Sequence, residues 1–441
     1  MKTVSGFSKL TKQEKISWIA KQLDAGDQFA FNGISNYWHK DPDMQKLFDE
    51  FSENTISNFY VPYGVAPNFV IDDETYTIPF AIEESSVVAA CSKSAKFWMD
   101  RGGFKTELIS TTKKGQVHFT WQGETAKLER FFADVRDELL SCVEGHVVSM
   151  KKRGGGIKDI RLRDKTCAME NYFQIDMAFE TCDAMGANFI NTILEAVGER
   201  LVELAAEYPI FSAVEKDIDV VMCILSNYTP DCVVRAYVEC PVEELGDFPA
   251  GMTADMFAKR FATAVNIARA DVNRAVTHNK GIFNGIDALV IATGNDFRAI
   301  EACGHAYAAK DGTYRGLSEC SVKDGIFTFE MTIPLALGTV GGLTELHPMA
   351  KMSLSLLGYP SAPELMRIVA CVGLAQNFGA LRSLVTTGIQ QGHMKMHLLN
   401  IMNQLGADET QIELAKQYFT DKTVSYQAAR DFLEMQRQQA V

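Results

Sequence analysis

The sequence predicts a mixed α/β protein that is built from more than one domain and ends in a helical segment. The chain has 441 residues, which suggests two or three domains at about 150 residues each. Between residues 115 and 225, alternating apolar residues typical of strands follow and precede segments with helical spacing. From residue 389 onward the pattern is helical and polar.

The composition excludes several classes of protein. A hydrophobic content of 47% with 22% charged residues is typical of globular chains and argues against disorder. The net charge of −13 counts against a nucleic-acid-binding protein, which needs clustered Lys and Arg. The ten cysteines contain no C-x-x-C pair, which suits free thiols in a reducing cytosol and disfavours a paired-thiol zinc site. No signal peptide and no apolar run of about 18 residues is recognisable, so we expect a cytoplasmic protein without a transmembrane helix.

The first half of the chain begins with helices. Residues 1–50 have an amphipathic helical pattern, and Thr11 with Glu14 forms a capping-box sequence. Residues 51–110 mix short apolar runs with turn signals, at Pro62-Tyr63-Gly64 and at Arg101-Gly102-Gly103.

Residues 115–225 predict a complete small sheet. The apolar pattern gives a strand at 117–121, a helix at 128–139, strands around 160–162 and 173–179, a helix at about 184–207 and a strand at 218–225. The glycines of Arg153-Gly154-Gly155-Gly156 break the chain after the first helix. This order of elements is that of a ferredoxin-like split βαβ unit, in which two helices lie on one face of a sheet.

The remainder predicts a larger α/β region and a helical appendage. Residues 226–388 contain helical stretches around 253–277 and 361–387, and an apolar run at about 287–292 that indicates a strand. From 389 to the end, Gly392 and Gly406 interrupt a polar helical pattern.

One segment is suited to binding phosphate. The dinucleotide fingerprint G-x-G-x-x-G and the P-loop sequence are both absent. Asp183-Ala-Met-Gly-Ala-Asn188 instead lies where a strand ends and a helix begins. Free N–H groups and the helix dipole at such a point attract a pyrophosphate, and Gly186 permits close approach. The alternative is an Asp cap followed by small residues that pack.

Charged residues elsewhere suggest acid–base chemistry. Lys280 and Asn284 are four residues apart, each followed by glycine, and Asp296 follows the predicted strand. A lysine beside a carboxylate can stabilise an oxyanion, although a surface Lys and a turn Asp are the simpler interpretation. Glu84 lies in Glu83-Glu84-Ser85-Ser86 between apolar stretches, where it can act as a general acid or complement a helix dipole.

Two histidines occur on the C-terminal segment. His393 and His397 are four residues apart, but the H-E-x-x-H sequence of a zinc protease is absent. One catalytic histidine on a flap hinged at Gly392, or two solvated side chains, are the alternatives.

Together these segments resemble HMG-CoA reductase of the soluble bacterial type, called class II. The carriers are Glu53-Asn54-Thr-Ile, Pro62-Tyr-Gly-Val-Ala-Pro67, Glu83-Glu84-Ser-Ser86, Asp183-Ala-Met-Gly-Ala-Asn188, Leu225-Ser226-Asn227, Thr277-His-Asn-Lys280-Gly, Gly294-Asn-Asp296, Val372-Gly-Leu-Ala-Gln376-Asn377 and Gly392-His393-Met. Their shared order and spacing, from about residue 50 to the end, make the resemblance specific.

The resemblance implies reduction of HMG-CoA, through bound mevaldehyde, to mevalonate and free coenzyme A with two NAD(P)H. Lys280 is expected to stabilise the oxyanion and Asp296 to hold Lys280. Glu84 is expected to supply a proton to the aldehyde oxygen, and His393 to protonate the departing thiolate. Mevalonate oxidation by the same enzyme, or a silent relative that only binds CoA or nucleotide, are the alternatives.

The resemblance also implies the binding residues. The substrate carboxylate and hydroxyl are assigned to Ser86, Arg274 and Asn284, with Glu53 and Asn54 reaching the site from the neighbouring subunit of a homodimer or a higher oligomer. The cofactor residues are Asp183, Met185, Gly186, Asn188, Asn227, Gln376, Val147 and Ser149. No metal and no membrane partner is expected.

The implied domains are a large CoA- and substrate-binding domain (1–112 and 223–388), an inserted ferredoxin-like NAD(P)-binding domain (113–222) and a C-terminal helical flap (389–441). Two positions depart from the family pattern. Ser57 stands where Gly is common, and Val147 stands about where NAD-preferring members have Asp. Because Lys151, Lys152 and Arg153 follow Val147, the sequence favours NADPH, or use of both cofactors.

Overall fold

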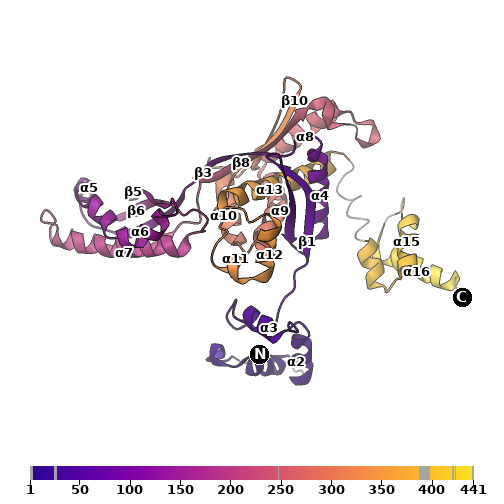
Figure 1. Ribbon diagram of the computed structural model, residues 1–441, viewed down its shortest axis with the longest axis horizontal. Coiled ribbons are helices and arrows are strands. Elements are labelled where there is room, and N and C mark those ends of the chain that lie inside the picture. Colours follow the sequence, from indigo (N-terminus) through magenta and orange to yellow (C-terminus); the bar gives the residue numbers. More distant parts are fainter. Residues whose placement is uncertain are drawn as a thin grey trace. The chain divides into compact units, whose positions relative to one another are not determined.

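The computed structural model describes residues 3–23, 27–246, 248–386, 398–419, 422 and 424–439. The chain divides into two compact units, Met1–Pro62 and Tyr63–Val441 (Figure 1). Helices and strands alternate through the second unit, so the predicted mixed α/β class is confirmed.

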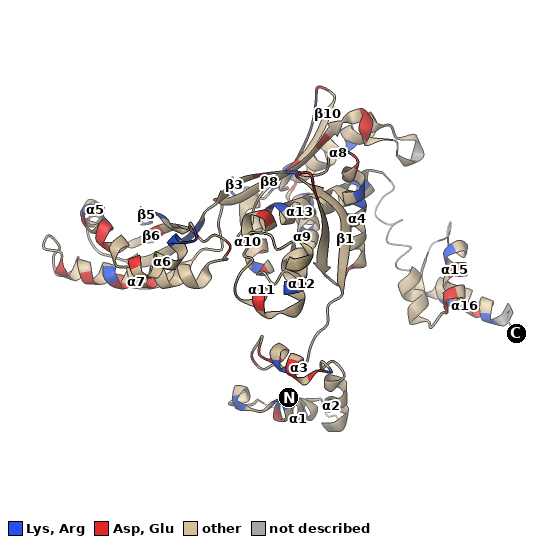
Figure 2. Ribbon diagram, viewed as in Figure 1, with Lys and Arg blue, Asp and Glu red and all other residues tan. Residues whose placement is uncertain are grey.

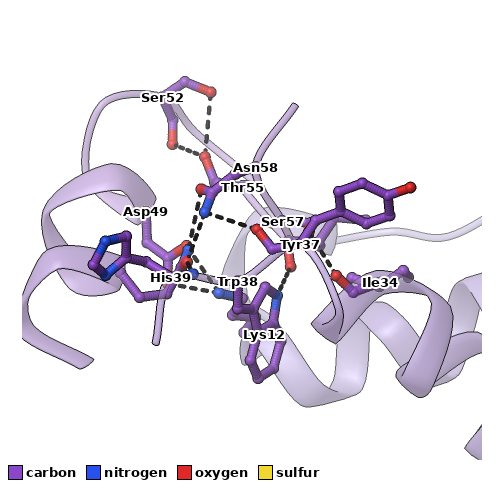
Figure 3. A network of polar contacts seen from close by, with 12 residues as sticks. Lys12, Ile34, Tyr37, Trp38, His39, Asp49, Ser52, Thr55, Ser57 and Asn58 are labelled. Carbon is purple, nitrogen blue, oxygen red and sulfur yellow. Dashed lines mark hydrogen bonds and ion pairs between the residues drawn. The ribbon is translucent and has the colours of Figure 1, made fainter. Parts of the chain in front are cut away.

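The first unit is helical. It contains η1 (Phe7–Lys9), α1 (Lys12–Gln22), α2 (Asp27–Ser35) and α3 (Pro42–Asp49). Thr11 and Glu14 form the predicted capping box at the start of α1. The segment after α3 is held by the polar contacts in Figure 3, where the Ser57 hydroxyl donates to the Ile34 carbonyl at 2.7 Å. Serine at position 57 therefore has a structural partner within this unit.

One antiparallel sheet has the strand order β5-β6-β4-β7. Its elements in chain order are β4 (Lys113–Thr120), α5 (Thr125–Ser141), α6 (Glu144–Lys151), β5 (Gly156–Asp164), β6 (Tyr172–Glu180), α7 (Ala187–Glu207) and β7 (Asp219–Leu225). Alternate residues of β4 and β6 are buried and form one hydrophobic cluster with residues of the helices. Charged residues of both signs lie along α5 and α7 (Figure 2). The order of strands and helices is that of a split βαβ unit with the additional helix α6.

A second sheet has the order β3-β8-β10-β9, and β1 with β2 forms a separate hairpin. These elements are β1 (Tyr63–Ile71), β2 (Glu74–Ala81), β3 (Lys105–Thr111), β8 (Cys232–Pro241), β9 (Ser318–Lys323) and β10 (Ile326–Pro334). The helices are α4 (Ser85–Met99), η2 (Val242–Leu245), η3 (Pro249–Gly251), α8 (Ala254–Ala270), α9 (Val272–Ala292), α10 (Phe297–Ala308), α11 (Leu343–Leu346), α12 (Pro348–Leu356) and α13 (Ala362–Val385). Together they enclose the largest hydrophobic cluster, to which α13 contributes most of its length.

The predicted strand at 287–292 is wrong, because these residues form the end of helix α9. Ala288, Leu289 and Val290 are all buried in the core. A helix buried on most sides presents a continuous apolar run, which cannot be distinguished from a buried strand by periodicity alone. At the other end of the chain, the expected turn at Pro62-Tyr63-Gly64 is instead the start of β1.

Helix α13 is long and apolar, although no apolar run of membrane-spanning length is expected from the sequence. By length and composition it is the one helix among the described residues that could cross a bilayer. In the structure, 67% of the most apolar stretch of this helix is buried. The helix starts with a capping box formed by Ser361 and Glu364. Burial in the core of the second unit accounts for its apolar sequence.

The C-terminal residues form a small helical cluster. Residues 398–404 are helical and are followed by α15 (Glu409–Tyr418) and α16 (Tyr426–Gln439). Leu398, Met402, Phe419 and Phe432 belong to its apolar interior. Gly406 has a φ of +69° after the first helix, so the predicted break at this glycine is confirmed, whereas Gly392 lies outside the described residues.

Candidate active site

The predicted phosphate-binding segment is a turn between β6 and α7. Gly186 caps α7 with a φ of +95° and no side-chain cap hydrogen bond is made there. The N–H groups of the first turn of the helix are thus not satisfied by a capping side chain. A Cβ atom at Gly186 would lie 2.5 Å from the Thr181 methyl carbon, so only glycine fits. Asp183 therefore does not cap α7, although Gly186 packs closely as the alternative expects. An uncapped helix start suits an anion, and phosphate binding at this turn stays a prediction.

Asp183 has a structural role in this turn. Its Oδ1 accepts from the Ala362 N–H at 2.8 Å, and its carbonyl accepts from the Thr339 N–H at 2.8 Å. A Cβ at Gly338 would lie 2.5 Å from the Met185 nitrogen, so the two backbones are in close contact. Met185 and Asn188 remain half-buried and exposed, respectively. The turn is therefore fixed against the segment 337–340 and the start of α13.

The glycine-rich loop before β5 lies next to this turn. The Cys182 thiol donates to the Arg153 carbonyl at 3.2 Å, and a Cβ at Gly155 would lie 2.5 Å from the Glu180 carbonyl oxygen. Lys151, Lys152 and Arg153 are exposed. Their positive charges consequently lie on the loop that borders the turn 183–188.

The assignment of Val147 to the cofactor site requires correction. Its side chain is 1% exposed and packs in the hydrophobic cluster under the sheet. The one-turn spacing of α6 turns Val147 inward, while Val148 and Ser149 are exposed. The Ser149 carbonyl accepts from Arg153 Nε at 3.4 Å, so Ser149 belongs to the neighbourhood of the basic loop and the Val147 side chain does not.

Glu84 lies at the start of α4 without capping it. It is the N-cap residue, yet its carboxylate makes no cap hydrogen bond. Its Oε1 instead accepts from the Ser86 hydroxyl at 2.5 Å. Glu84 and Ser86 are half-buried, whereas Glu83 is exposed. The structure thus brings together a predicted catalytic carboxylate and a predicted substrate-binding hydroxyl.

Helix α9 carries three of the predicted residues. Lys280 is exposed and Asn284, one turn further along, is half-buried. Among the residues that the structure describes, no carboxylate forms an ion pair with Lys280. Arg274 is half-buried, and burial lowers the pKa of its guanidinium. Its side chain has no described carboxylate partner, which leaves it available for a substrate carboxylate.

Asp296 is placed differently from the expectation that it holds Lys280. It caps α10, accepting from the N–H groups of Arg298 and Ala299, and pairs with the Arg298 side chain at 3.1 Å. No hydrogen bond or ion pair joins Glu84, Lys280 and Asp296 to one another in the described part of the chain. Asp296 follows a helix, not a strand, which corrects the strand-end argument for this residue.

Asp296 is nevertheless connected with the phosphate-binding turn. The neighbouring Asn295 accepts through its Oδ1 from the Gly338 N–H at 2.8 Å. Gly338 in turn contacts Met185 of the turn. Two motifs that are more than 100 residues apart in the sequence are thus joined through the segment 337–340.

Gln376 and Asn227 are the other predicted cofactor residues. Gln376 on α13 is 5% exposed, and its Oε1 has no hydrogen-bond partner among the described residues. A Cβ at Gly285 would lie 3.0 Å from the Gln376 Cβ, so these two residues are in contact. Asn227 is exposed in the bend between β7 and β8. A buried amide oxygen without a partner is costly unless a ligand or water pairs with it.

Three predicted residues cannot be related to this site. Glu53 and Asn54 are exposed in the first unit, where the Thr55 hydroxyl donates to the Ser52 carbonyl across their turn and Asn54 has a φ of +58°. His393 lies outside the described residues, as does His397. Their assignments stay predictions.

Sequence reasoning missed two buried polar groups on α9. His278 Nε2 lies 2.6 Å from the Ser318 hydroxyl, which donates to Asn377 Oδ1 at 2.8 Å. Since the hydroxyl proton is used by Asn377, His278 must donate through Nε2. Burial lowers the pKa of His278 to about 3. Asp287 faces Glu301 of α10, and burial first, then the Glu301 charge, raises the pKa of Asp287 to about 8.

A cavity of about 430 Å³ lies elsewhere and contains none of the predicted site residues. Its basic residues Lys114, Arg161 and Arg163 are already paired with Asp231, Asp159 and Asp176. The described residues contain no cluster of three or more His, Cys, Asp or Glu side chains suited to a metal ion. All ten cysteines are free thiols.

Comparison with known proteins decides the family. A sequence model described as hydroxymethylglutaryl-coenzyme A reductase matches residues 13–398. The chain belongs to the hydroxymethylglutaryl-coenzyme A reductase family. It is 35% identical over 438 residues to the reductase of Archaeoglobus fulgidus, covering 98% of this chain and 94% of that protein. It is 31% identical to a probable reductase of Borreliella burgdorferi, covering 92% and 89%.

Solved structures agree with the family. A reductase from Streptococcus pneumoniae superposes with a TM-score of 0.72 at 36% identity, covering 98% of this chain and 99% of that chain. A class II reductase from the same organism, bound to NADPH in open conformations, gives a TM-score of 0.70 at 36% identity, covering 87% and 100%. This chain is a class II hydroxymethylglutaryl-CoA reductase and an NAD(P)H-dependent oxidoreductase, which confirms the predicted family and activity.

Proposed function

We propose that the reductase uses NADPH, with the pyrophosphate at the start of α7 and the 2′-phosphate near the loop 151–153. The observation that carries this proposal is the uncapped first turn of α7 beside three exposed basic side chains. The backbone N–H groups and helix dipole suit a pyrophosphate, and Lys or Arg suits a further phosphate. The relative from Streptococcus pneumoniae that binds NADPH supports this choice.

In this proposal the cofactor supplies hydride twice, and the chain's own residues handle charge and protons. Lys280 donates to the oxyanion that forms at the thioester carbonyl, because its ammonium is not engaged by a described carboxylate. Glu84 gives a proton to the aldehyde oxygen and is oriented by the Ser86 hydroxyl. Arg274 and Asn284 hold the substrate carboxylate and hydroxyl, and His393 protonates the coenzyme A thiolate.

We infer a homodimer from the exposure of Lys280 in a single chain. Lys280 is exposed on α9, as are Val276 and Val272, one and two turns before it on the same face. An exposed apolar face next to a catalytic lysine normally requires a cover. A second copy of the chain, contributing Glu53 and Asn54, would close this face and bring Asp296 and Lys280 into one site. We assign the enzyme to the cytoplasm, with the large substrate domain, the inserted ferredoxin-like cofactor domain and the C-terminal flap at the boundaries given above.

Steady-state kinetics with both cofactors tests the proposed specificity. The paired charge reversals Lys152→Glu and Arg153→Glu should lower kcat/KM for NADPH by about ten- to a hundredfold, the effect of losing one charge-assisted contact. Activity with NADH should change by less than about threefold, since NADH lacks the 2′-phosphate.

Lys165→Glu is the matched control, because Lys165 is exposed beyond the opposite end of β5. It should leave the ratio of the two cofactors unchanged. A wild-type enzyme that prefers NADH, with a ratio that the double reversal does not alter, would contradict the proposal.

A further inference from the structure

Lys113 is a buried lysine that no step proposed above uses. It is the first residue of β4 and is 5% exposed. Its ammonium donates to Thr181 Oγ1 at 2.6 Å, to the Ala184 carbonyl at 2.7 Å and to the Leu337 carbonyl at 3.4 Å. No carboxylate in the described residues lies within ion-pair distance of it.

A buried ammonium without a counter-ion is expensive for a folded chain. Burial lowers the pKa of Lys113, although the nearby thiols and carboxyl groups oppose this shift. An apolar side chain at the same inward position of β4 would avoid this cost. The acceptors suggest what the charge achieves. The Ala184 carbonyl belongs to the proposed phosphate-binding turn, and the Leu337 carbonyl belongs to the segment 337–340 that packs against it.

Thr181 and Lys113 together fix the turn. The Thr181 hydroxyl donates to the Ala184 carbonyl at 2.7 Å, so this carbonyl accepts from both side chains. Its peptide plane is therefore held two residues before Gly186, the residue that caps α7. The Thr181 methyl group lies directly under Gly186. The conformation of the turn thus depends on a hydroxyl and an ammonium that lie beneath it.

Leu337 extends the connection towards the catalytic residues. The next residue, Gly338, contacts Met185 and donates to Asn295, the neighbour of Asp296. Lys113 is consequently hydrogen-bonded both to the turn and to the segment that separates the turn from Asp296.

We propose that Lys113 is a positioning residue for the cofactor. It holds the Ala184 carbonyl inward, so that the first N–H groups of α7 face the cofactor phosphates, and it places a positive charge beneath them. This inference rests on the proposed binding of the cofactor at this turn. Loss of Lys113 should weaken cofactor binding more than it affects the HMG-CoA site.

Lys113→Met tests the inference because methionine approximates the length of the chain without its charge. We expect the NADPH Kd, measured by fluorescence titration without substrate, to rise about ten- to a hundredfold. The KM for HMG-CoA should change by less than about twofold. Loss of three hydrogen bonds opposes the gain from removing a buried charge, so the thermal midpoint is measured alongside to show that the variant is folded. A residue with only a structural role would not weaken NADPH binding while leaving the KM for HMG-CoA unchanged.

Lys114→Met is the matched control. Lys114 is the adjacent residue on the same strand, and its ammonium pairs with Asp231 at 2.6 Å on the other face. It should leave the NADPH Kd unchanged. If Lys113→Met does not fold, Thr181→Val removes one of the two donors to Ala184 at nearly constant shape and should also raise the NADPH Kd.

Asn188→Ala and Gly186→Val separate this inference from the proposed cofactor site. If they weaken NADPH binding while Lys113→Met and Thr181→Val do not, Lys113 has no positioning role. If none of the four substitutions changes the NADPH Kd, the cofactor does not bind at this turn and the proposed site itself is wrong. Weaker binding in all four supports both.

Discussion

The Oδ1 atom of Asp183 accepts a 2.8 Å hydrogen bond from the backbone N–H of Ala362, the first residue of α13. The carbonyl oxygen of Asp183 accepts from Thr339 in addition. A carboxylate at a helix start satisfies a free N–H group and complements the dipole of that helix. The acid at the start of the turn 183–188 therefore connects this turn to the apolar core helix of the second unit.

Asp183→Ala should destabilise the enzyme through loss of this contact. A hydrogen bond to a charged group contributes about 1.5–3 kcal/mol, so the free energy of unfolding in urea should fall by about that amount. Asp183→Asn keeps an oxygen acceptor and should lose less. Because the contact is structural, the Asn variant should retain a near-wild-type KM for NADPH. A large rise in that KM without any loss of stability would instead indicate direct contact with the cofactor.

Lys280→Ala should abolish most of the activity by removing the donor to the oxyanion. Loss of one such donor typically lowers kcat by about 10²–10³. Both HMG-CoA and mevaldehyde should be affected, since each reduction generates negative charge on oxygen. Lys259→Ala is the control, because Lys259 is an exposed lysine on the neighbouring helix α8. Normal turnover by a folded Lys280 variant would refute the assigned role.

His393→Gln should affect the two reductions unequally. Only thioester reduction expels a thiolate, so a residue that protonates this group is needed there and not for mevaldehyde. We expect kcat for HMG-CoA to fall by about 10²–10⁴, the usual contribution of general acid catalysis, with a smaller loss for mevaldehyde. Equal losses with both substrates would show that His393 acts in some other way.

Much of the small sheet could be predicted from the sequence because its burial alternates. Val117, Phe119, Ile175 and Met177 are buried at two-residue spacing, as a sheet covered on one face requires. The turn at Gly186 was also recognisable, since a strand pattern gave way there to a helical one. Local periodicity suffices for elements of this kind.

The larger region was less predictable because its core elements are buried on several sides. Residues 287–292 lack periodicity for this reason, and β8 and β10 were not anticipated. Lys113 was missed, although its position in the sequence could have indicated its burial. It alternates with residues of β4 so that it lies on the same buried face as Gly115 and Val117. The burial of Val147 depends on which side of α6 faces the sheet. The basic residues 151–153 that follow it in the sequence do not show which side that is.

His278 should make the enzyme sensitive to acid. Its pKa is lowered to about 3 in the folded chain, against about 6.5 when unfolded. Between these values the unfolded chain binds the additional proton, so stability is lost as the pH falls from 6.5 towards 3. His278→Gln keeps an N–H donor for Ser318 but does not titrate. Its urea-unfolding free energy relative to wild type should therefore rise on acidification, by at most about 1.4 kcal/mol per pH unit.

Asp287 is a second titrating group, with the opposite dependence on pH. Asp287 Oδ1 is buried without a hydrogen-bond partner among the described residues. Burial is the main reason that its pKa rises to about 8, and the negative charge of Glu301 on α10 adds to it. Burial and a neighbouring negative charge both favour the protonated, neutral form of the Asp287 carboxyl group.

Asp287→Asn should therefore stabilise the enzyme at alkaline pH. The folded chain holds one more proton than the unfolded chain between pH 3.8 and about 8. Wild-type stability consequently declines as the pH rises through this window, and the decline ends above it. Asparagine stays neutral and can donate to Glu301, so the urea-unfolding free energy of the variant should exceed that of wild type increasingly from pH 5 to pH 8, reaching a gain of about 1–3 kcal/mol. Asp311→Asn, at an exposed carboxylate after α10, should show no such trend. If the difference between the Asp287 variant and wild type is constant across this range, Asp287 is ionised in the folded enzyme and its pKa is not raised.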